Sequence, residues 1–149
     1  MTRLGSLVAI LYLDLDNFKF INDSLGHLAG DKALQMVADR LRECLRLEDM
    51  VARIGGDEFS AILDDISSVQ HAIVTAGRII TALGSIDCFD GGERIQASIG
   101  VSIFPDHGTD IESLLRHADN AMYIAKRLGK GRCCLADTEN LSSSNRAVE

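Results

Sequence analysis

The chain lacks the features by which membrane proteins, secreted proteins and nucleic-acid-binding proteins are often recognised. No apolar run approaches the roughly 18 uncharged residues that a membrane-spanning helix needs, and the longest is SLVAILYL at 6–13. We expect no signal peptide, because that run leads into acidic residues without a small-residue cleavage site. An excess of positive charge is also missing, since 15 Lys and Arg against 22 Asp and Glu give a net charge of −7. We therefore expect neither nucleic-acid binding nor direct contact with an anionic membrane.

The chain also lacks a zinc-binding arrangement of cysteine. The spacing of its four cysteines, Cys44, Cys88, Cys133 and Cys134, does not match that of zinc ligands. Cys133 and Cys134 are neighbours in an expected strand, so their side chains would point to opposite faces. We expect buried free thiols and a reducing, cytoplasmic location.

Neither an internal repeat nor a linker interrupts the 149 residues, which fit one domain. Apolar periodicity and turn residues predict a strand (7–15), a helix (31–47), a hairpin (51–54 and 59–63), a helix (67–83), a strand (94–104), a helix (111–128) and an edge strand (132–136). This order predicts an α+β sandwich, in which helices flank a mixed central sheet. The polar residues 137–149 are expected to form a disordered tail.

Three local features refine this prediction. Asp31 is expected to cap the helix at 31–47. The DGG triplet at 90–92 indicates a turn before the strand at 94–104. Every second residue of that strand from Ile95 to Ile103 is apolar, which predicts that one of its faces packs against the core.

Two pairs of acidic residues stand at expected strand ends. Asp57 and Glu58 follow two glycines in the hairpin turn, and such a turn alone is most often only a solvated loop. Asp14 and Asp16 end the apolar strand and share one face, where carboxylates are costly unless they are paired or bound to metal. If the two pairs converge, they form a site for Mg²⁺, which completes its shell with substrate phosphates. Two such ions are the usual apparatus of phosphoryl transfer.

Basic and polar residues near these acids are suited to a nucleotide. Lys19, Lys126 and Lys130 can neutralise phosphate charge, although lysines also favour helix ends and solvent for ordinary reasons. Asn22 can donate to and accept from a nucleobase edge, and Asp31 can accept two N–H groups. These patterns alone indicate magnesium-dependent nucleotide chemistry and nothing finer.

Four blocks of sequence resemble the GGDEF-domain diguanylate cyclases. They are DLDNFKFINDSLGHLAGD (14–31), ARIGGDEF (52–59), ASIGVSIFP (97–105) and ADNAMYIAKRLGKGR (118–132), and they follow the family's order. The resemblance implies a fold like the catalytic palm of nucleotidyl cyclases and polymerases. It also implies condensation of two GTP into cyclic di-GMP with release of two pyrophosphates, across a homodimer in which each domain holds one GTP.

The resemblance assigns roles to matched positions. It implies two Mg²⁺, or Mn²⁺, held by Asp14, the Leu15 carbonyl, Asp57 and Glu58, with Asp57 often assigned as the base for the ribose 3′-hydroxyl. The backbone of Asn17 and Phe18, together with Lys19, Lys126 and Lys130, is expected to hold phosphates. The remaining substrate contacts are expected from Asn22, Asp31 and Leu34, with guanine read by the first two of these.

A second site is implied by RLED at 46–49. Arg46 and Asp49 match the family's RxxD product-inhibition motif, with five residues between Asp49 and Gly55. Arg78 is a weaker candidate for an auxiliary contact to cyclic di-GMP. The ordinary alternative is a helix-end salt bridge between Arg46 and Asp49.

One family feature is missing. The segment that normally precedes the first strand, with its D-x-L-T-G-L-x-N-R motif, is absent, so residues 1–136 are interpreted as an N-terminally truncated GGDEF domain. We expect a regulatory domain in the full-length protein. Alternatives to an active cyclase are a non-catalytic GTP or cyclic di-GMP binding module, an inactive fragment of a multidomain protein, a cyclase of altered product, and a structural interaction domain. The intact acids favour the enzyme, and Asp31 favours guanine.

Overall fold

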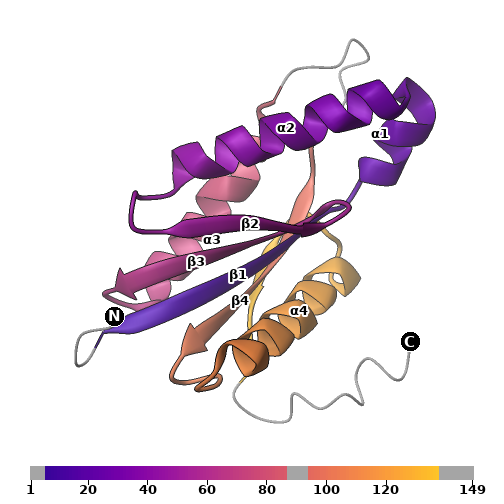
Figure 1. Cartoon of the computed structure of the whole chain (residues 1–149). Coiled ribbons are helices and arrows are strands. Elements are labelled where there is room, and N and C mark those ends of the chain that lie inside the picture. Colours follow the sequence, from indigo (N-terminus) through magenta and orange to yellow (C-terminus); the bar gives the residue numbers. More distant parts are fainter. Residues whose placement is uncertain (1–5, 87–93, 138–149) are drawn as a thin grey trace.

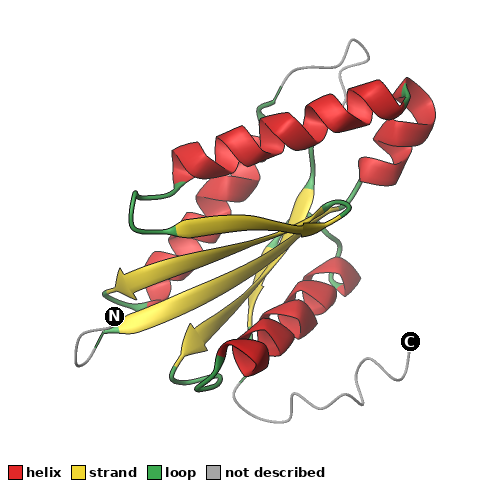
Figure 2. Ribbon diagram, in the orientation of Figure 1, coloured by secondary structure: helices red, strands yellow, loops and turns green. Residues whose placement is uncertain are grey.

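The computed structural model describes residues 6–86 and 94–137. The elements are β1 (Leu7–Leu15), α1 (Phe18–Leu25), α2 (His27–Cys44), β2 (Met50–Gly55), β3 (Glu58–Ile66), α3 (Val69–Gly84), β4 (Ala97–Phe104), α4 (Ile111–Arg127) and β5 (Cys133–Leu135). The five strands form one sheet in the order β2-β3-β1-β4-β5. Its pairs are antiparallel except for β4 and β5, which are parallel. The predicted α+β class with a mixed sheet is confirmed (Figure 2).

Helices cover both faces of the sheet around the central strand β1 (Figure 1). Ala9, Leu11 and Leu13 of β1 belong to the larger core, which lies under α2 and α3. Ile10 points to the other face, where it packs with Leu114 and Ala118 of α4. Because β1 is covered on both faces, a nearly continuous apolar run is the sequence it requires.

One sequence prediction about these elements was wrong, and one helix was missed. Asp31 is not an N-cap, because α2 starts at His27 after Gly26, whose φ of 94° ends the preceding helix α1. Helix α1 itself was missed, since it is only eight residues long and buries only Ile21. Strand β4 packs one face in the core as predicted, through Ala97, Ile99, Val101 and Ile103. Its other face, which carries Ser98 and Ser102, is also buried, because α4 covers it.

Those two serines look like solvent-facing positions in the sequence, but each is buried with a hydrogen-bond partner. Ser98 donates to Asp16 at 2.8 Å and Ser102 donates to the Leu114 carbonyl at 2.7 Å. The hairpin, the edge strand β5 and the other two long helices lie where they were predicted, within a few residues. Of the cysteines, Cys44, Cys133 and Cys134 are free, half-buried thiols as expected. Cys88, the DGG turn at 90–92 and residues 138–149 lie outside the described residues.

None of the helices in the described ranges is long and apolar enough to cross a bilayer.

A buried histidine fixes the turn between β4 and α4. The His107 side chain is 6% exposed, and its Nδ1 accepts a hydrogen bond from the Ile103 amide at 2.7 Å. Burial lowers the pKa of this imidazole below 6.5, against a raising effect of Asp106. An Nδ1 that accepts a hydrogen bond carries no proton, so the folded structure favours the neutral ring.

His107 is expected to make the protein less stable in mild acid. The unfolded chain takes up a proton on this residue near pH 6.5, whereas the folded ring does so only at lower pH. The unfolded state therefore binds more protons, and the free energy of unfolding falls as pH drops through 6.5, by up to about 1.4 kcal/mol per pH unit from this group. His107→Asn keeps an acceptor at the same place without a titrating ring, so denaturant unfolding between about pH 7.5 and about pH 5 should show a flatter slope. An unchanged slope in the variant would contradict this.

Candidate functional site

The two predicted acidic pairs converge at one end of the sheet. Asp14 on β1 lies directly across from Glu58 on β3 in the strand register. The Leu15 amide donates to the Asp57 carbonyl at 3.2 Å, which holds the hairpin turn against the end of β1. Gly56 in that turn has a φ of 47°, a conformation that glycine adopts without strain. The glycine before the two carboxylates thus allows the tight turn that places them at the end of β1.

Lys126, near the end of α4, reaches over these acids. Its Nζ lies 3.0 Å from Asp14 Oδ2 and 3.1 Å from Asp16 Oδ1. The Asp16 side chain is only 1% exposed and also accepts from Ser98 Oγ at 2.8 Å and from the Gly131 amide at 3.0 Å. Asp16, directly after β1, therefore contacts both ends of the segment from Lys126 to Gly131.

The electrostatics of the site follow from burial and close like charges. Burial raises the pKa of Asp14 above its ordinary value; Lys126 opposes this shift and the nearby Asp57 charge adds to it. Burial lowers the pKa of Lys126, but its bonds to Asp14 and Asp16 outweigh that effect and the net shift is upward. Lys126 therefore stays an ammonium at neutral pH.

Glu58 is held by a half-buried tyrosine. Tyr12 Oη donates to Glu58 Oε1 at 3.0 Å. Burial, followed by this bond, raises the pKa of Tyr12 to about 12. The phenol therefore remains a donor throughout the physiological range.

The Asp14 and Asp57 carboxylates supply the oxygen ligands that a hard divalent cation prefers, but the described residues do not form a complete metal-binding arrangement. Asp14 Oδ1 is buried and finds no hydrogen-bond partner in the described part of the chain, and it lies close to the Asp57 carboxylate. Such a pair of oxygens is what Mg²⁺ uses when phosphates and water complete its shell. However, no three or more His, Cys, Asp or Glu side chains within residues 6–86 and 94–137 are arranged to hold a metal ion.

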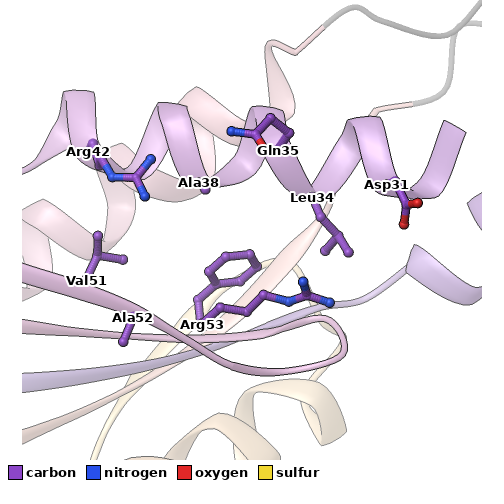
Figure 3. Close-up of a pocket in the computed structure, with 9 residues that line it drawn as sticks. Asp31, Leu34, Gln35, Ala38, Arg42, Val51, Ala52 and Arg53 are labelled. Atoms are coloured by element: carbon purple, nitrogen blue, oxygen red, sulfur yellow. The ribbon is translucent and has the colours of Figure 1, made fainter. Parts of the chain in front are cut away.

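A pocket of about 400 Å³ lies between α2 and β2 (Figure 3). Of the predicted substrate residues, Asp31 and Leu34 line it. Asn22 is not among its lining residues, and its side chain lies where a Cβ on Gly30 would be. The glycine at position 30 therefore leaves room for Asn22 between α1 and α2.

Three polar residues of this pocket escaped the sequence analysis: Gln35, Arg42 and Arg53. Arg53 also donates from Nε to the Gly56 carbonyl at 2.9 Å, so it links the pocket to the acidic turn. The signal was available, because Asp31, Gln35 and Arg42 recur at helical spacing on one face of α2 and Arg53 lies within ARIGGDEF.

The predicted phosphate-binding residues are not all gathered at the acids. Asn17 uses its side chain to bond the Arg94 carbonyl at 2.6 Å and the Gln96 amide at 3.2 Å. Lys19 is 90% exposed and pairs with Asp23 at 3.2 Å, and Lys130 is an exposed residue with a φ of 66°. Phe18 begins α1, where a backbone N–H has no partner within the helix and can donate a hydrogen bond to an anion. Of the predicted lysines, only Lys126 contacts the acids.

At the second predicted site, Arg46 and Asp49 bind each other. Arg46 donates to Asp49 from Nε at 3.2 Å and from Nη2 at 3.0 Å, and the Asp64 amide also donates to Asp49. The Asp49 side chain is 3% exposed, and its hydrogen bond raises the pKa of Arg46. Arg78 donates to the Cys44 carbonyl at 2.7 Å. The structure thus has the salt bridge that the sequence analysis named as the alternative.

Removing the Asp49 carboxylate is expected to destabilise the fold. Asp49→Ala leaves the backbone amides of Arg46 and Asp64 without their acceptor and removes the carboxylate that pairs with the Arg46 guanidinium, which costs about 2–4 kcal/mol. Asp39→Ala is a matched control, because its carboxylate is exposed and pairs with Arg42 only at 3.4 Å, so the expected loss is below about 0.5 kcal/mol. Urea unfolding measures the loss of stability in each variant. A loss in Asp49→Ala as small as that in Asp39→Ala would contradict this prediction.

A family model described as "Diguanylate cyclase, GGDEF domain" matches residues 2–132. The chain therefore belongs to the GGDEF domain family, and the resemblance drawn from the four sequence blocks is confirmed.

Individual relatives agree with this assignment. The chain is 42% identical over 132 residues to diguanylate cyclase TpbB of Pseudomonas aeruginosa, a match that covers 87% of this chain and 30% of TpbB. It is 38% identical over 137 residues to the cyclic di-GMP phosphodiesterase PdeR of Escherichia coli K12, covering 89% of this chain and 20% of PdeR. A solved structure of the TpbB GGDEF domain has a TM-score of 0.86 at 39% identity and covers 96% of this chain and 82% of that one. The chain thus spans less than a third of either full-length relative.

Proposed function

We propose that this domain is a diguanylate cyclase that condenses two GTP molecules into cyclic di-GMP and releases two pyrophosphates. The observation that carries the proposal is the convergence of Asp14, Asp57 and Glu58 at the end of the sheet, beside the only lysine among the predicted ones that contacts them. The family membership and the name of TpbB support the same reaction.

In the proposed reaction, the ribose 3′-hydroxyl of each GTP attacks the α-phosphorus of the other. The new O–P bond forms as the bond to pyrophosphate breaks, and the 3′-hydroxyl proton leaves to a base, the role proposed for Asp57. When bound, Mg²⁺ neutralises phosphate charge and lowers the pKa of the 3′-hydroxyl. Asp14, the Leu15 carbonyl, Asp57 and Glu58 would hold two such ions, and Mn²⁺ can replace them. Lys126, with Lys19, Lys130 and the amides of Asn17 and Phe18, would bind the phosphates.

Guanine is proposed to occupy the pocket between α2 and β2. The Asp31 carboxylate can accept from guanine N1–H and N2–H₂, whereas adenine offers no such pair of donors. Leu34 supplies apolar contact in the same pocket, and Asn22 would read the base from α1. A base that leaves the carboxylate unpaired is disfavoured strongly, which gives specificity for GTP.

Each domain would hold one GTP, so the reaction needs an antiparallel homodimer. Arg46, Asp49 and Arg78 are proposed as a product-inhibition site for cyclic di-GMP. Binding there requires Arg46 to exchange its bonds to Asp49 for bonds to phosphate or guanine, which reduces the net free energy of binding. A regulatory domain in the full-length protein and a cytoplasmic location are part of the same proposal.

Chromatography of the products tests the proposed reaction. The purified chain, checked for folding by circular dichroism, is incubated with GTP and Mg²⁺, and in parallel with ATP and Mg²⁺. We expect cyclic di-GMP from GTP and no cyclic product from ATP. A folded protein that forms no cyclic dinucleotide at any protein concentration would refute the proposed activity.

A second candidate is a non-catalytic module that binds GTP or cyclic di-GMP. It is favoured by the ion pair of Lys126 with Asp14, which occupies one of the proposed metal ligands, and by the similarity to PdeR, whose name states another activity. Under this hypothesis the chain binds cyclic di-GMP in equilibrium dialysis but releases no pyrophosphate from GTP.

A further inference from the structure

The bridging position of Lys126 suggests more than phosphate binding. Its ammonium lies between two carboxylates at nearly equal distances, 3.0 Å from Asp14 Oδ2 and 3.1 Å from Asp16 Oδ1. The side chain is 25% exposed, so water screens these contacts only in part. Lys126 therefore supplies positive charge to both carboxylates.

The two carboxylates differ in how firmly they are held. Asp16 accepts hydrogen bonds from Ser98, Lys126 and the Gly131 amide, so both of its oxygens have partners. Asp14 has only the Lys126 contact on Oδ2, and its buried Oδ1 has no partner among the described residues. Asp16 is thus the fixed end of the bridge, and Asp14 is the end that a stronger cation can take.

We propose that Lys126 competes with a divalent cation for Asp14, and that Asp16 is the positioning residue that keeps Lys126 within reach after displacement. A cation held by Asp14 and Asp57 would weaken the attraction between the Asp14 carboxylate and the ammonium, which would remain bound to Asp16. The Lys126 N–H groups released from Asp14 are then free for an anionic oxygen of a phosphate. In this way, binding of the cation at Asp14 is coupled to the binding of phosphate by Lys126. The inference rests on the proposed function for the nature of the site, but it concerns binding of the cation alone.

The proposal makes opposite predictions for its two residues. Lys126→Gln removes the competitor, so Mn²⁺ alone should bind more tightly, by about tenfold for the loss of one partly buried charge pair. Asp16→Asn should weaken Mn²⁺ binding by a similar factor of about ten, because Lys126 then has only Asp14 as a charged partner. An asparagine at this position can still accept from the Gly131 amide and donate to the Ser98 hydroxyl, so the surrounding backbone keeps its bonds.

The experiment measures the dissociation constant of Mn²⁺ from the decrease in its free electron paramagnetic resonance signal, without nucleotide. Lys32→Gln is the matched control, since it removes one positive charge from an exposed position on α2. We expect it to leave the constant within about twofold of the parent, because exposed charges at a distance are screened. Asp14→Asn in the Lys126→Gln background should abolish the tight binding, which locates the ion.

The outcomes separate this inference from the proposed function. Tighter binding in Lys126→Gln with weaker binding in Asp16→Asn supports the inference, even if the chain makes no cyclic di-GMP. Unchanged or weaker binding in Lys126→Gln overturns it, as does the absence of Mn²⁺ binding in both the parent and this variant, whatever the enzymatic activity. If Lys126→Gln does not fold, tighter binding in Asp16→Asn overturns the inference and weaker binding there, reversed by Asp16→Glu, supports it.

Discussion

The double variant Asp57→Asn, Glu58→Gln is expected to lose cyclic di-GMP synthesis by at least about a thousandfold. Both substitutions keep the shape of the side chain and remove the negative charge that would hold the metal ions. Metal ions contribute several kcal/mol to phosphoryl transfer, and about 1.4 kcal/mol corresponds to a tenfold change in rate. The fold should persist, because both residues lie at the hairpin turn and removal of the Asp57 charge relieves repulsion of Asp14.

A control with the same change in net charge is available on α2. Asp39 and Glu43 form exposed ion pairs with Arg42 and Arg40, so Asp39→Asn, Glu43→Gln removes two negative charges far from the turn in sequence. We expect this control to keep its activity within about threefold, since exposed ion pairs contribute little to stability. If the two double variants lose activity equally, net charge and not the acidic turn controls the reaction.

The second large effect is expected at Gly100, on the face of β4 that α4 covers. A Cβ at this position would lie against the Ala118 carbonyl and the Met122 amide, and 2.9 Å from Met122 Cα. These are helix backbone atoms, which cannot rotate away as a side chain does. Gly100→Ala should therefore force α4 from the sheet and lower the free energy of unfolding by about 3 kcal/mol.

This displacement should also reach the site, because Lys126 lies one turn beyond Met122 on the same helix. Gly77→Ala is the matched control: no atom outside its own helix lies within 4 Å of the added Cβ. In the interior of a helix this change should stabilise the protein by about 0.5–1 kcal/mol. Urea unfolding of the two variants measures both effects. A Gly100→Ala protein as stable as the parent would mean that α4 is not tightly packed on β4.

The elements that sequence reasoning placed well are those in which local pattern and tertiary burial agree. The run at 7–15 became the central strand, and RIGGDEFSAIL became a hairpin, because apolar runs separated by glycine allow few other structures. Helix α1 was missed because it is only eight residues long and only Ile21 of them is buried, so it contributes little to the core. Asp31 resembled a cap only because the start of α2 is set by the turn at Gly26, four residues earlier than periodicity indicated.

The site was foreseen as a set of acids, but its internal connections were not. Period two placed Asp14 and Asp16 on one face, yet nothing in the spacing indicated that Asp16 would be buried against Ser98 and Lys126. Ser98 lies 82 positions from Asp16 in the sequence and Lys126 lies 110 positions from it, and one sequence alone cannot reveal such distant pairings. The bond between Arg46 and the Asp64 carbonyl is of the same kind, because it depends on how α2 ends beside β3.

The stoichiometry of products from GTP tests the proposed activity most directly. Cyclic di-GMP and pyrophosphate are quantified in the same reaction, over a range of protein concentrations. The account predicts two pyrophosphates for each cyclic di-GMP, with a specific activity that rises with protein concentration as homodimers form. Hydrolysis of GTP without any cyclic dinucleotide, or binding of nucleotide without turnover in the folded protein, would contradict it.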